Sequence, residues 1–97
     1  MPHYITLANW TEQGVKSVKD SPKRIEQGRQ MAATFGGKLE AFYYTMGRYD
    51  FIFVTEFPND ESAAKFLYSL GRLGNLKSHT LKAFTQDEGV KVINSLS

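Results

Sequence analysis

The chain contains no cysteine among its 97 residues, and it has only one tryptophan, three prolines and two histidines. The absence of cysteine excludes disulfide bonds, thiolate nucleophiles and thiolate metal sites. No apolar run approaches the roughly 18 residues of a membrane-spanning helix. The first residues, Met1 to Tyr4, also lack the basic start of a secretion signal. We therefore expect a cytoplasmic protein with no membrane partner.

The chain also has little net charge: 12 basic and 10 acidic residues leave a net charge of +2. The most basic stretch, residues 16–29, is interrupted by Asp20 and Glu26, which is typical of a solvated helix face. We expect no nucleic-acid partner. The chain also lacks a phosphate-binding loop, a dinucleotide-binding glycine pattern and a Ser-His-Asp order, so no cofactor is expected.

Aromatic residues are abundant by contrast, at 13% of the chain. They are prominent in residues 49–57, which read as a β-strand. Alternation along it places Phe51 and Phe53 on one face and Ile52 and Val54 on the other, so both faces of the sheet require cover. We predict that helices cover one face and a second copy of the sheet covers the other, with Phe51 or Phe53 near the sheet-to-sheet interface.

Turn and cap residues divide the chain into alternating element types. Thr11 is predicted to cap a short helical segment, and Asn59 to cap the helix that follows it. Ser21 is predicted to cap a longer helix that has Pro22 at its first position. Gly47-Arg48 is predicted to form a two-residue hairpin turn. The expected elements are strands at 3–10, 38–46, 49–57 and 76–84, helices at 21–35 and 60–70, and a short amphipathic helix around 90–96.

This order is β-α-β-β-α-β, for which the right-handed crossover rule leaves few connections. It predicts one α+β domain over residues 1–97, with a ferredoxin-like four-stranded antiparallel sheet and two helices on one face. The first and third strands should be central. The uncovered face should meet a partner's sheet, as in a dimeric α+β barrel, so a homodimer or a larger oligomer of dimers is expected.

Four motifs follow one another along the chain: Ser21-Pro22-Lys23-Arg24, Phe42-Tyr43-Tyr44-Thr45-Met46-Gly47-Arg48-Tyr49-Asp50, Leu73-Gly74-Asn75 and Thr80-Leu81-Lys82-Ala83-Phe84. Together they resemble the GYD domain family of small bacterial proteins, over nearly the whole chain. The family's naming residues would fall on Gly47, Tyr49 and Asp50. The resemblance implies a ferredoxin-like dimeric barrel, and it implies no settled activity or cofactor.

The segment from Gly47 to Asp50 has two interpretations. Glycine permits the positive φ of a turn and Asp50 can accept backbone N–H groups, which makes the segment structural. Alternatively, Tyr49 donates a hydrogen bond to an anionic or carbonyl ligand at a barrel mouth, and Asp50 orients a neighbouring group.

Hydrogen-bonding aromatic side chains support a hypothesis of ligand binding. Buried phenol and indole groups require partners, and a bound ligand can be that partner. We predict a pocket lined by some of Trp10, Tyr44, Tyr49 and His79 that takes a small aromatic or anionic ligand. The alternative is that these rings belong to the core and to an interface. His79 and Tyr44 are also the candidates for a catalytic role.

The two histidines lie on strands that the predicted topology makes neighbours. With Glu56 or Asp50 they could form a site of two histidines and one carboxylate, but solvated histidines are the preferred interpretation because no HxH or HxxxH spacing occurs. No metal is therefore expected, and His3, near the terminus, is the weaker candidate.

Three classes of function remain. A homo-oligomeric module for small-molecule binding or assembly is the first. The alternative is a cofactor-independent oxygenase or isomerase, which other dimeric α+β barrels host, and the third class is a purely structural or regulatory partner protein. Convergence of His79 and Tyr44 on a cavity would favour the enzyme.

Overall fold

One four-stranded antiparallel sheet organises the protein, of which the computed structural model describes residues 1–97. Its strands lie in the order β2-β3-β1-β4, so the first and third strands are central, as predicted. The strands are β1 His3–Trp10, β2 Lys38–Tyr44, β3 Phe51–Glu56 and β4 Leu76–Ala83. The predicted ferredoxin-like βαββαβ order is thereby confirmed.

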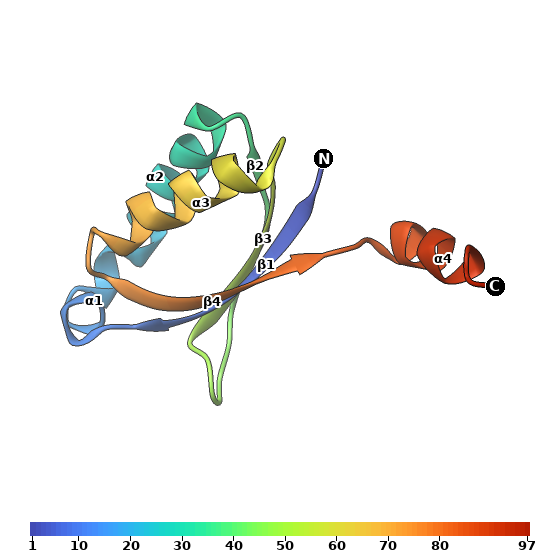
Figure 1. Ribbon diagram of the computed structural model, residues 1–97. Helices are drawn as coiled ribbons and strands as arrows, with labels where there is room; N and C mark the ends of the chain where they lie inside the picture. Colours follow the sequence, from blue (N-terminus) through green and yellow to red (C-terminus); the bar gives the residue numbers. More distant parts are fainter.

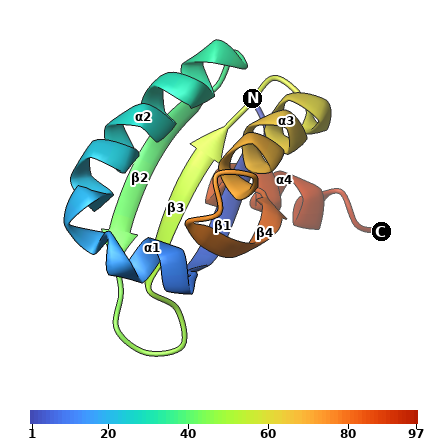
Figure 2. The same cartoon turned by 90° about the vertical axis from the view of Figure 1, so that its left-hand side faces the viewer.

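Two helices cover one face of this sheet and leave the other face open. They are α2 Ser21–Thr34 and α3 Asp60–Gly71, which lie side by side over the sheet (Figures 1 and 2). The shorter α1 Glu12–Lys16 and a 3-10 turn at Val18–Asp20 connect β1 to α2. The last helix, α4 Gln86–Asn94, projects from the body of the protein beyond the end of β4 (Figure 1).

Helix caps agree with the sequence at two positions and differ at a third. Thr11 accepts a hydrogen bond from the Gly14 N–H at 3.0 Å, and Asn59 caps α3. The prediction that Ser21 caps α2 is wrong, because the helix already includes Ser21. The Ser21 hydroxyl instead shares a 2.8 Å hydrogen bond with the Tyr44 hydroxyl. The side chain therefore ties α2 to β2 rather than to its own backbone.

The core lies between the helices and the sheet. Phe51 and Phe53 are buried there, and the Phe53 ring lies 6.4 Å from that of Phe66 on α3. The prediction that Phe51 or Phe53 lies near a sheet-to-sheet interface is therefore wrong. Alternation along β3 has the expected period, but α3 covers the aromatic face, which leaves Ile52 and Val54 on the open face.

The connection between β2 and β3 is longer than predicted. The strands end at Tyr44 and begin again at Phe51, so Gly47-Arg48 is the middle of a loop rather than a two-residue turn. Inside the loop the Thr45 hydroxyl donates to the Tyr49 carbonyl at 2.6 Å, a contact that holds the loop together where strand pairing has ended. Gly47 has a φ of +124°, so the requirement for glycine holds.

Candidate functional site

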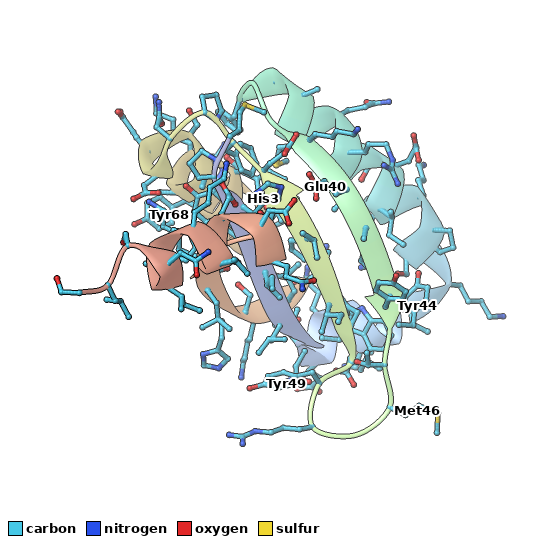
Figure 3. All side chains as sticks on the ribbon, turned by 90° about the vertical axis from the view of Figure 1, so that its right-hand side faces the viewer. His3, Glu40, Tyr44, Met46, Tyr49 and Tyr68 are labelled. Atoms are coloured by element: carbon cyan, nitrogen blue, oxygen red, sulfur yellow. The ribbon has the colours of Figure 1, made fainter.

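The four predicted site residues fall into two groups on opposite sides of the sheet. Trp10 and Tyr44 lie on the helix-covered side, with ring centroids 6.3 Å apart. Tyr49 and His79 lie together on the open side of the sheet, with ring centroids 6.4 Å apart. Figure 3 shows Tyr44 and Tyr49 on opposite sides of the β2–β3 loop. The four residues therefore do not line one pocket.

The pairing of the strands explains why the four residues lie on two sides of the sheet. His79 pairs with Leu7, which alternates with the buried Thr6 and Ala8 and so faces away from the helices. Tyr49 lies outside β3, in the loop, so the alternation that places Phe51 in the core does not extend to it. His79 and Tyr44 do not converge, and the polar pair that would have favoured an enzyme is not formed.

A cavity of about 240 Å³ lies on the helix-covered side, between α2, α3 and the sheet. Trp10 lines it together with the aromatic rings of Phe42, Phe51 and Phe53. Tyr44 is not in the lining, but its hydroxyl contacts Ser21, which is. Most of the wall is apolar, and the polar side chains come chiefly from α2, where Arg24 and Gln27 contribute.

The open side carries a second group of polar residues, centred on His3. Its Nε2 lies 3.2 Å from a carboxylate oxygen of Glu40 and 3.2 Å from one of Glu56, and its Nδ1 lies 3.8 Å from Glu88 of α4. Figure 3 shows His3 and Glu40 side by side near α4. The Nδ1 atom is buried and has no hydrogen-bond partner.

His3, Glu40 and Glu56 each offer one ligand atom within 4.8 Å of the others, so these residues could hold a cation. The metal hypothesis from the sequence joined His3 to His79, whereas the register places His79 four pairs along β1 from His3. Sequence reasoning missed Glu40 and Glu88. Glu40 follows Leu39, where a shift in the β2–β3 register occurs, and strand alternation alone does not indicate its direction.

One titratable pair ties the sheet to α3. The Tyr4 hydroxyl donates a hydrogen bond to Asp60, and Lys82 forms an ion pair with the same carboxylate at 3.0 Å. Burial raises the pKa of Tyr4 to about 12, and the hydrogen bond and negative charge of Asp60 act in the same direction. The hydrogen bonds from Tyr4 and Lys82 in turn lower the pKa of Asp60.

The arrangement of sheet, paired helices and open face defines a ferredoxin-like α+β domain. The structure is similar to the solved structure of MtbAldR, with a TM-score of 0.69 and 13% sequence identity. The match covers 88% of this chain and 52% of that protein, so the chain spans about half the length of this structural relative. At this identity the likeness shows the fold alone.

The chain belongs to the GYD domain family, whose model matches residues 4–93. This confirms the resemblance seen in the sequence motifs. The chain is also 31% identical over 84 residues to the "Glutamine synthetase and cystathionine beta-lyase binding protein" of Thermus thermophilus. That alignment covers 86% of this chain and 88% of the relative. None of the four helices has the length and apolar character of a membrane span.

Proposed function

We propose that this protein is a regulatory or structural partner that acts by binding other proteins, among them metabolic enzymes. The observation that carries this proposal is the relationship to the Thermus protein, whose name describes binding to two enzymes. The alignment extends over most of both chains, which supports a shared role. The regulatory-partner class is thus better supported than a module for small-molecule binding alone.

The surface of the protein is consistent with association. Large apolar side chains on or beside the open face are exposed: Tyr43 by 61%, Leu81 by 54% and Phe84 by 67%. Ile93 on α4 and Leu96, two residues beyond its end, are exposed by 63% and 74%, and no residue of that helix is buried. Strand pairing places Tyr43 beside Ile52 and Leu81 beside Ile5, so apolar side chains are neighbours on the open face, as is typical of a protein-binding site.

The experiment uses the purified chain with purified glutamine synthetase and cystathionine β-lyase of its own organism. Isothermal titration calorimetry should show saturable binding of at least one enzyme with a Kd of about 10 μM or tighter, the range of specific transient complexes. An unrelated oligomeric enzyme of similar net charge is the control. Absence of binding to both enzymes at about 100 μM would remove the proposal.

We further propose that the open face of the sheet binds a second copy of the chain. One end of this face is acidic, with Glu40 and Glu56 beside His3, and the other end carries Lys77 and His79. A two-fold axis that lies between two facing sheets and runs across the strands brings the acidic end of each copy over the basic end of the other. Ile5, Leu7, Ile52, Val54 and Leu81 lie between these ends and would form the apolar centre.

A further inference from the structure

The cavity under α2 and α3 has the size and composition of a ligand site. Its volume of about 240 Å³ exceeds that of an apolar protein cavity of roughly 150 Å³ that is known to hold benzene. Eleven of its 16 lining residues are hydrophobic. It therefore has room for an aromatic ring that carries a short side chain.

A glycine on α2 keeps this space open. Gly28 lines the cavity, and a Cβ atom added there would meet no atom within 4 Å. Glycine inside a helix is unfavourable relative to alanine, and no close contact of the backbone requires it here. By contrast, a Cβ on Gly14 would lie 2.0 Å from the Asn75 carbonyl oxygen, so that glycine is required by packing.

The cavity also carries a positive charge. Arg24 lies one helical turn before Gly28 and is part of the lining. Its guanidinium donates to the Ser17 hydroxyl at 3.1 Å and to the carbonyls of Ser17 and Gly14 at 3.0 and 3.3 Å. None of these partners is charged, and Arg24 takes part in none of the ion pairs of the protein.

We propose that this cavity binds a small monocarboxylate with an aromatic or branched apolar body. The body occupies the space beside Gly28, against Trp10 and the phenylalanine rings, and the carboxylate pairs with Arg24. A guanidinium matches the two oxygens of a carboxylate. A phosphate dianion would require further cationic groups, and Arg24 is the only cationic residue of the lining. This site is separate from the open face that the proposed protein association uses.

Trp10 supplies the readout, because it is the only tryptophan of the chain and lines the cavity. Its fluorescence is followed while 3-phenylpropionate is added to the intact protein. We expect a saturable change, and binding at least tenfold weaker for 3-phenylpropan-1-ol, which has the same body without the charge. No saturable change up to about 10 mM 3-phenylpropionate, or equal binding of the acid and the alcohol, would overturn the proposal.

Two variants localise the binding. Gly28→Leu places a side chain in the empty space and should abolish the titration while far-UV circular dichroism stays unchanged. Arg24→Gln should weaken acid binding at least tenfold and leave alcohol binding unchanged. Undiminished acid binding in either folded variant would overturn the proposal. If Gly28→Leu does not fold, Gly28→Ala replaces it and should weaken binding at least threefold; unchanged affinity would overturn the proposal.

Two matched control variants test whether weaker ligand binding comes from the cavity itself or from any change of charge or of a helical glycine. Lys23→Gln removes an exposed positive charge from the same helix, and Gly71→Ala changes a helical glycine that is outside the lining. Both should bind 3-phenylpropionate as the unchanged protein does. Equal weakening in Lys23→Gln and Arg24→Gln would show a general charge effect and would count against the site. Binding of the enzymes, measured separately on Gly28→Leu, should persist. Loss of ligand binding and loss of enzyme binding are therefore distinguishable results.

Discussion

At the scale of single residues, the Tyr4 phenol links the stability of the protein to alkaline pH. The pKa of a free tyrosine is 10.0, and that of Tyr4 in the folded protein is about 12. Both states are protonated below pH 10, and the unfolded state ionises first as the pH rises, so stability falls between about pH 10 and 12. Tyr4→Phe lacks this group. It should be about 1 kcal/mol less stable than the unchanged protein at pH 8 because the hydrogen bond to Asp60 is lost.

Urea unfolding from about pH 8 to 11.5 checks the prediction. The difference in unfolding free energy between the two proteins should narrow as the pH rises above 10. Tyr68→Phe is the control, because Tyr68 is 75% exposed. A difference that stays constant over this range would contradict the raised pKa of Tyr4.

At the scale of elements, the loop between β2 and β3 is held by the end of β1. The Asp50 carboxylate accepts a hydrogen bond from the Trp10 N–H at 2.9 Å, and the Asp50 N–H donates to the Ala8 carbonyl at 2.9 Å. Asp50→Ala removes the acceptor and leaves the Trp10 N–H without its partner, which should cost about 1 to 3 kcal/mol of stability. Asp50→Asn retains an acceptor oxygen and should cost less.

Chemical denaturation of both variants measures this ranking. If Asp50→Asn and Asp50→Ala destabilise equally, the negative charge rather than the hydrogen bond is what matters at this position. If neither changes the denaturation midpoint, the loop does not depend on β1. The Asp50 contacts support the structural interpretation of the segment from Gly47 to Asp50, since its carboxylate is engaged by the backbone.

At the scale of the whole molecule, the proposed self-association predicts a concentration-dependent dimer. Sedimentation velocity at about 5 to 100 μM should show a dimer, because a stable interface can bury the apolar centre of the open face. Leu81→Lys places a charge in that centre and should shift the protein to monomer without loss of secondary structure. Lys65→Leu, a change of opposite sense on the exposed side of α3, is the control and should leave the dimer intact. A monomer at the highest concentration would refute the prediction.

Much of the fold could be predicted because its signals are local. Strand β1 was predicted with its observed bounds, and Thr11 and Asn59 cap the helices that follow them. The predicted site residues are brought together only in part, since Trp10 lines the cavity whereas Tyr49 and His79 lie on the other side of the sheet. The difference arises because alternation gives two faces but does not indicate which of them the helices will cover.

The sequence by itself determined the element order, the central position of β1 and β3 and the glycine in the β2–β3 loop, because periodicity, caps and backbone conformation act over a few residues. Tertiary structure decided which side chains that are far apart in the sequence come into contact. It brought Glu40, Glu56 and Glu88 from three elements to His3. It also left open space beside Gly28 of α2. Whether a neighbour fills that space depends on how α3 packs beside α2, and no local pattern encodes that distance.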